Sequence, residues 1–189
     1  MAIRLDLVRQ VTDDELLAIS ERNPGYQFER TAKGELVVSP TGSDGGRRSL
    51  EVAGQIRDWN RRHKLGVAFD SSAGFRLPDG SCRSPDASWI RRERWESLPR
   101  EARAGFAALC PDAVFELRSP SNTVSELREK MQAYLDNGAR LSVLLDPDSR
   151  AVEVYRPGAQ TERHAAATLL PLDPELPGFV LDCSAVFED

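Results

Sequence analysis

Histidine, cysteine and long apolar runs are all scarce in this sequence. Its 189 residues include 2 histidines and 3 cysteines. Cys82, Cys110 and Cys183 are odd in number and widely spaced, which excludes a disulfide framework or a zinc knuckle and predicts buried free thiols. The longest apolar runs, such as LSVLL, are far shorter than the roughly 20 residues that a bilayer requires. The N-terminal stretch MAIRLDLVRQ also lacks a signal-peptide core, so we expect a cytoplasmic protein with no membrane contact.

Two common catalytic motifs are also missing. The sequence has no Gly-x-Ser-x-Gly elbow and no Gly-rich loop ending in Lys-Ser or Lys-Thr, which argues against serine hydrolases and P-loop enzymes. With so few histidines, a metal site would have to consist mostly of carboxylate and carbonyl oxygens. Such a site suits Mg²⁺ or Mn²⁺ better than zinc.

The charge balance limits the partners of the protein. The 30 acidic residues outnumber the 25 basic residues and give a net charge of −5, which repels a phosphate backbone at long range. Binding to nucleic acid would therefore need local basic clusters. Such clusters occur in RDWNRRHK and IRRERW, although runs of charge are more often solvated surface.

The order of predicted elements indicates an α/β fold in a single domain over residues 1–189. Thr12 and Glu15 have capping-box spacing and predict a helix over residues 13–21, followed by a hairpin of YQFER and ELVVS. The next helix carries Leu50, Ala53 and Ile56 on one face and ends near Gly66. The remaining predicted elements are, in chain order, strands at VAFD, GFRL and PDASWI, a short helix around RRERWESL, a strand at DAVFELR, a helix over residues 123–137, strands at RLSVLLD and AVEVYRP, and the tail LPGFVLDCSAVFED packed back as a strand or edge segment.

Two of the predicted core strands carry acidic residues. Side chains alternate between the faces of a strand, so Glu116 and Arg118 share a face with Val114, and Asp86 shares one with Ile90. If the two strands pair, Asp86 and Glu116 lie a few ångströms apart, which is costly unless a divalent cation or a proton neutralises them. In the alternative interpretation each acid only pairs with a nearby arginine, Glu116 with Arg118 and Asp86 with Arg83.

Lys130 allows two interpretations as well. It lies on the flank of the apolar stripe of the helix over residues 123–137, one turn after Glu126. A surface pair between Glu126 and Lys130 would contribute a few tenths of a kcal/mol. Alternatively, the helix crosses the end of the strand and brings the ammonium group of Lys130 to the carboxylates.

These residues together resemble a known family. The segments SPDASWI, CPDAVFELRSPSNTVSELREKMQAYLDNGARLSVLLDP and VEVYRPG, in this order, resemble the Uma-type restriction endonucleases of the PD-(D/E)XK nuclease superfamily, from about Glu29 onward. The resemblance implies a restriction-endonuclease-like fold, in which helices flank a mixed central β-sheet, here preceded by a helix and a β-hairpin. It also implies that Asp86, Glu116 and the backbone carbonyl of Leu117 bind Mg²⁺, or alternatively Mn²⁺.

The sequence departs from the superfamily pattern at one position. Arg118 stands where the superfamily has lysine, and an arginine cannot act as a base because it stays protonated. The resemblance then assigns Lys130 to orient the nucleophile and Arg118 to stabilise charge in the transition state. Glu51, on the earlier helix, would be an additional metal ligand.

The implied activity is metal-dependent hydrolysis of phosphodiester bonds, with DNA as the expected nucleic acid. Restriction-type nucleases often dimerise to cut both strands, so the resemblance also implies a homodimer. The alternative is a catalytically inactive nuclease fold that binds nucleic acid or a protein partner, since a fold does not fix a function.

Overall fold

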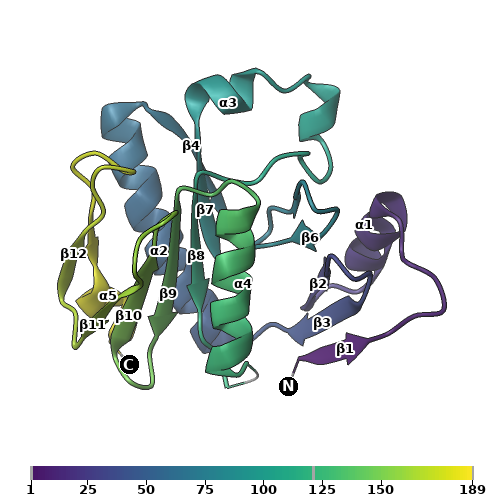
Figure 1. The fold of residues 1–189 in the computed structure, drawn as a ribbon, viewed down its shortest axis with the longest axis horizontal. Coiled ribbons are helices and arrows are strands. Elements are labelled where there is room, and N and C mark those ends of the chain that lie inside the picture. The colour runs from purple at the N-terminus through teal and green to yellow at the C-terminus, as the bar shows by residue number, and fades with distance from the viewer. Residues whose placement is uncertain (1, 121, 189) are drawn as a thin grey trace.

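A six-stranded mixed β-sheet forms the centre of the computed structural model, which describes residues 2–120 and 122–188 (Figure 1). Its strand order is β11-β10-β9-β8-β7-β4. Only β8 and β9 run parallel, and the other neighbours are antiparallel. The strands are β4 (Gly66–Asp70), β7 (Ala87–Arg91), β8 (Ala113–Leu117), β9 (Leu141–Asp146), β10 (Ala151–Tyr155) and β11 (Glu162–Ala165). The predicted mixed α/β sheet is thus confirmed.

One long helix covers each face of this sheet. Val52 and Trp59 of α2 (Ser43–His63) pack in one apolar cluster with Phe115 of β8. Met131 of α4 (Val124–Asp136) packs in a second cluster with Val114, the neighbour of Phe115 on the same strand. The predicted alternation of side chains along β8 is therefore present, and both faces of the strand are buried.

The N-terminal segment forms a second sheet beside α4 (Figure 1). Its strand order is β1-β3-β2-β6-β5, and the predicted hairpin consists of β2 and β3. The predicted first helix is α1, and its capping box between Thr12 and Glu15 is present. These elements are β1 (Ile3–Leu5), α1 (Asp13–Arg22), β2 (Tyr26–Arg30), β3 (Leu36–Pro40), β5 (Phe75–Arg76) and β6 (Cys82–Arg83).

The remaining elements are short. They are α3 (Arg92–Glu96), the 3₁₀ helix η1 (Glu101–Arg103), β12 (Leu169–Pro171), β13 (Val180–Asp182) and α5 (Cys183–Phe187). The predicted C-terminal strand is present as β13, which pairs with β12, but the tail after it forms a helix. Within the described ranges, no helix is long and apolar enough to cross a membrane.

The prediction for Leu50 is wrong. Its side chain is 70% exposed, whereas Val52, Ile56 and Trp59 form the buried stripe of α2. Each helical residue turns the chain by about 100°, so Leu50 and Val52 point about 160° apart. The three cysteines are free and buried, as the sequence predicts.

Candidate active site

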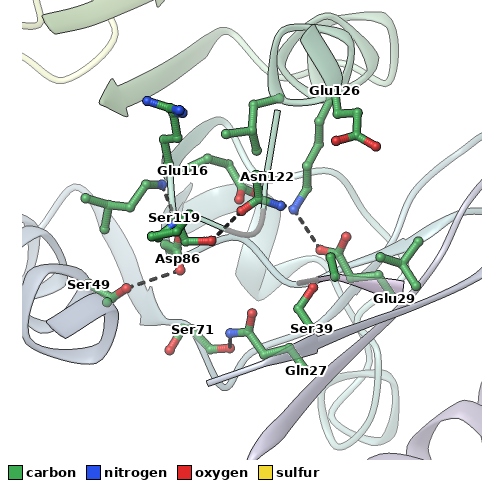
Figure 2. A pocket seen from close by; sticks show the side chains of 18 of the residues that line it. Gln27, Glu29, Ser39, Ser49, Ser71, Asp86, Glu116, Ser119, Asn122 and Glu126 are labelled. Carbon is green, nitrogen blue, oxygen red and sulfur yellow. Dashed lines mark hydrogen bonds and ion pairs between the residues drawn. The ribbon is translucent and has the colours of Figure 1, made fainter. Parts of the chain in front are cut away.

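A cleft of about 1220 Å³ lies between the N-terminal sheet and one end of the central sheet. Residues of β2, β3, the start of α2, the end of β8 and α4 line it, and we call it the central cleft. Its charged lining includes Glu29, Arg83, Asp86, Glu116, Arg118 and Lys130. Figure 2 shows Asp86 and Glu116 in the middle of this pocket, with Ser49 and Glu29 on opposite sides of them in the view.

The pairing of β7 with β8 brings Asp86 and Glu116 to the same end of the sheet. The two strands are antiparallel, with Ala87 opposite Phe115 and Ser88 opposite Val114. Asp86 directly precedes β7, so the same register continues to Glu116. The backbone N–H of Leu117 donates a hydrogen bond of 2.7 Å to Oδ2 of Asp86. This contact fixes the Asp86 carboxylate at the end of β8.

Asp86 is also held by the helix on the other side. The hydroxyl of Ser49, on α2, donates to Oδ1 of Asp86 at 3.1 Å. Burial raises the pKa of Asp86, although the Leu117 N–H, the charge of Lys130 and the Ser49 hydroxyl each lower it. Two hydrogen-bond donors thus orient the Asp86 carboxylate, but the interactions that favour its charged form do not offset its burial.

Glu116 points toward α4 and is only 4% exposed. Its Oε1 accepts a hydrogen bond from the Tyr134 hydroxyl at 2.9 Å and lies 2.7 Å from the Lys130 ammonium. Burial raises the pKa of Glu116, since the opposing effect of Lys130 is offset by the nearby charges of Asp86 and Glu29. Both of these contacts involve Oε1.

Lys130 lies between two buried carboxylates. Its Nζ is 2.7 Å from Glu116 and 2.9 Å from Oε1 of Glu29. Burial lowers the pKa of Lys130, but the two carboxylates raise it above its ordinary value, so Lys130 is a cation. Glu126 instead accepts hydrogen bonds from Thr123 and pairs with Arg4 at 3.3 Å. The surface pair between Glu126 and Lys130 is therefore not formed.

Glu29 is a site residue that the sequence did not indicate. It lies on β2, and its carboxylate contacts Lys130, the Arg83 guanidinium at 3.1 Å and the N–H of Ser84 at 2.8 Å. Burial would raise the pKa of Glu29, but Lys130 and Arg83 bring it below its ordinary value. The alternating hairpin pattern alone could not show that Glu29 of β2 meets Lys130 of α4.

Two of the predicted site residues are turned elsewhere. Nη1 of Arg118 contacts Asp146 at 3.0 Å and Asp148 at 3.1 Å, so this arginine lines the central cleft but is bound to the end of β9. Glu51 accepts a hydrogen bond from Gln55 at 3.0 Å and does not line the cleft. Glu51 follows Ser49 by two residues, about 200° around α2, so only Ser49 can face Asp86.

The predicted arginine partners of the two acids are not the observed ones. Arg83 pairs with Glu29 instead of Asp86, and Arg118 pairs with Asp146 and Asp148 instead of Glu116. The sheet explains the second difference, because the N–H of Arg118 donates to Leu145 and places its side chain beside the end of β9. Glu116 therefore pairs with Lys130 and accepts a hydrogen bond from Tyr134.

The donor set fits a divalent cation. Within residues 2–120 and 122–188, no group of three or more His, Cys, Asp or Glu side chains could hold a metal ion. Mg²⁺, however, is commonly bound by one or two carboxylates with water in the other positions, so Asp86 and Glu116 with the Leu117 carbonyl would suffice. Among the described residues, Glu29 and Glu116 pair with Lys130 and Glu29 also with Arg83, while the pKa values of Asp86 and Glu116 are raised, so a bound cation would favour their charged forms.

Comparisons with known proteins agree with the resemblance found in the sequence. Residues 13–184 match the model of the Uma2 family, which is described as "Putative restriction endonuclease". The crystal structure of "a putative nuclease belonging to DUF820" from Anabaena variabilis ATCC 29413 is similar, with a TM-score of 0.74 and 22% identity over 94% of this chain and 97% of that one. At this identity the likeness shows the fold alone. None of the curated proteins resembles the chain closely enough to count as a relative. The family model spans almost the whole chain, and the chain therefore belongs to the Uma2 family.

Proposed function

We propose that this protein is a Mg²⁺- or Mn²⁺-dependent endonuclease that hydrolyses phosphodiester bonds of DNA. One observation carries the proposal. The Lys130 ammonium lies 2.7 Å from Glu116, at the sheet end where the Leu117 N–H holds Asp86, in the wall of the central cleft. Membership of a family described as restriction endonucleases supports a nucleic acid as the substrate.

Asp86 and Glu116 would hold the cation, together with the backbone carbonyl of Leu117. When bound, the ion would supply Lewis acidity toward an oxygen of the scissile phosphate. Ser49 and the Leu117 N–H keep the Asp86 carboxylate in one orientation. Tyr134 does the same for Glu116, because its hydroxyl donates a hydrogen bond to Oε1.

Lys130 would act as a hydrogen-bond donor. Its pKa is raised by Glu116 and Glu29 against the effect of burial, so it keeps its protons near neutral pH and does not serve as a general base. A fixed ammonium group can orient an attacking water by donating to it and can stabilise negative charge that develops on the phosphate. Arg118 would contribute positive charge at the rim of the cleft while it binds Asp146 and Asp148.

A cleavage assay with several nucleic acids tests the proposal. Supercoiled plasmid, linear duplex DNA, single-stranded DNA and RNA would each be incubated with Mg²⁺, Mn²⁺ or EDTA. We expect the plasmid to be nicked or linearised with either cation and to stay intact in EDTA. The size of the active species in gel filtration would test the homodimer that the resemblance implies.

Two matched variants show whether the site is responsible. Asp86→Asn and Glu116→Gln keep the size of the side chain but remove its charge, and each should abolish cleavage. Glu153→Gln is the control, because Glu153 is a buried glutamate of β10 outside the central cleft. A wild-type protein that binds DNA in a mobility-shift assay but cleaves none of the substrates with either cation would contradict the proposal and favour an inactive binding module.

A further inference from the structure

Glu29 belongs to a different sheet from Asp86 and Glu116, yet its carboxylate reaches the same cluster. We propose that Glu29 is a positioning residue that fixes the ammonium group of Lys130, so that the N-terminal sheet is part of the catalytic apparatus. This inference rests on the function proposed for Lys130. Its basis is the set of contacts that Glu29 makes on both carboxylate oxygens.

Both oxygens of Glu29 already accept hydrogen bonds from protein groups. Oε1 accepts from Lys130 Nζ at 2.9 Å and from the N–H of Ser84 at 2.8 Å, and Oε2 accepts from Arg83 Nη1 at 3.1 Å. The side chain is only 10% exposed. Glu29 is therefore poorly placed to bind a metal ion or a substrate, and what it can do is hold Lys130.

Lys130 needs such a second contact. A lysine side chain is flexible, and its ammonium group has no directional preference comparable to that of a guanidinium. The contact of 2.7 Å with Glu116 alone would let the group follow any movement of that carboxylate toward a bound cation. With Glu29 at 2.9 Å, the ammonium group is held between a carboxylate of the central sheet and one of the N-terminal sheet.

Glu29 is itself fixed on a rigid element. Strand β2 pairs with β3 along its whole length, with Glu29 opposite Val37, and Arg30 pairs with Cys82 of β6. Arg83 follows Cys82 and binds Glu29 from the same sheet. The position of Lys130 is thus tied to the backbone of the N-terminal sheet through one carboxylate.

The test compares Glu29→Gln, Lys130→Met and the double variant in single-turnover and steady-state cleavage of plasmid DNA. Glutamine has the shape of glutamate and can still accept a hydrogen bond, but it lacks the charge, so Lys130 should lose the ionic contact that fixes it. We expect kcat to fall at least about tenfold with an unchanged KM, since small misplacements of catalytic groups are costly. If Glu29 acts through Lys130, the double variant should be no slower than Lys130→Met.

The matched control is Glu153→Gln. Glu153 is also buried and also pairs with a cation of α4, since it accepts a hydrogen bond of 2.9 Å from Nε of Arg128. This control removes a comparable link to the same helix without touching Lys130, so its kcat should stay at the wild-type value. If Glu29→Gln cannot be folded, Glu29→Asp keeps the charge, shortens the side chain by one methylene and should lower kcat in the same way. A wild-type kcat in the Glu29 variants, an effect on KM alone, or a further loss in the double variant would overturn the inference.

A second measurement does not depend on cleavage. The ¹⁵Nζ resonance of Lys130 should be sharp in the wild type, because an ammonium group held by two carboxylates exchanges its protons slowly. It should broaden or vanish in Glu29→Gln and persist in Glu153→Gln. If the wild type cleaves no nucleic acid, the proposed function fails. The resonance would still show whether Glu29 holds the ammonium group of Lys130 in place. An unchanged Lys130 signal in Glu29→Gln would refute the positioning role in either case.

Discussion

Lys130 and Arg118 both bring positive charge to the central cleft, but they are held in different ways. Lys130 is enclosed by Glu29 and Glu116, whereas Arg118 binds Asp146 and Asp148 at the end of β9. Only Lys130 contacts one of the two carboxylates proposed to bind the cation. The two basic side chains should therefore respond differently to substitution.

We predict that Lys130→Met lowers kcat by about a hundredfold or more, the usual effect of losing a group that orients water or stabilises charge. Arg118→Lys should keep most of the activity, because a lysine can still pair with Asp146 or Asp148. Turnover at saturating Mg²⁺ is the measurement.

Folding must be checked for the methionine variant. Removing one partner of a buried ion pair typically costs about 3–5 kcal/mol, so circular dichroism should first show that Lys130→Met is folded at the assay temperature. A folded Lys130→Met protein with wild-type turnover, together with an inactive Arg118→Lys protein, would contradict this prediction. The catalytic role would then belong to Arg118, at the end of β8.

Helix α4 is tied to the rest of the molecule on two flanks. Lys130 faces the central cleft, while Arg128 binds Glu153 on β10 through both carboxylate oxygens. The hydrogen bond from Arg128 is the main reason why the pKa of Glu153 is lowered, and the Tyr155 hydroxyl contributes as well. This second link should stabilise the fold without affecting catalysis.

The lowered pKa of Glu153 predicts a pH dependence of stability. A carboxylate whose pKa is lower in the folded than in the unfolded protein stabilises the fold above its unfolded pKa of about 4.3, and the contribution is lost as the pH falls through the folded value. The free energy of unfolding of the wild type should therefore exceed that of Glu153→Gln by about 1 kcal/mol near pH 7. The difference is small because the Arg128 side chain is half-exposed. Urea unfolding should show this difference shrinking below about pH 4. A difference that stays constant or grows in acid would contradict the assignment.

The start of β4 depends on a glycine. A Cβ at Gly66 would lie 2.2 Å from the carbonyl oxygen of Ile90 and 2.5 Å from the ring of Trp89, both on the neighbouring strand β7. We predict that Gly66→Ala lowers the free energy of unfolding by about 1–3 kcal/mol, as overpacking usually does. Gly54 lies in the interior of α2, and a Cβ there would meet no atom within 4 Å apart from its chain neighbours and the backbone of its own helix, so Gly54→Ala should instead raise the free energy of unfolding by about 0.5–1 kcal/mol. Equal effects of the two substitutions in urea unfolding would contradict this prediction.

A cation bound at the end of the central sheet should stabilise the fold. Glu116 is buried and Asp86 is partly buried, both have raised pKa values, and a ligand that prefers the folded state raises the melting temperature. We predict that millimolar Mg²⁺ or Mn²⁺ raises the melting temperature of the wild type by a few degrees, since about 1 kcal/mol corresponds to about 2–4 °C in a chain of this size. Calorimetry with EDTA should reverse the shift. An equal shift in Asp86→Asn would place the cation elsewhere.

Local rules in the sequence determined a large part of this protein. The alternation of side chains placed Glu116 on one face of β8, and the capping box of Thr12 and Glu15 set the start of α1. These features depend on periodicities and hydrogen bonds within a few residues, which is why they can be read from a single chain. The family motif pointed to Lys130 for the same reason, since it spans one strand and the next helix.

The charges that meet in the cleft come from elements far apart in the sequence, and their pairing follows from how these elements pack. Glu29 and Lys130 are separated by 101 positions and meet because the N-terminal sheet packs beside α4. Arg118 turned to Asp146 because β8 and β9 are neighbours, and Glu51 missed the cleft because the rotation of α2 presents Ser49 instead. A side chain carries its charge in the sequence, but its partner is set by the packing of distant elements.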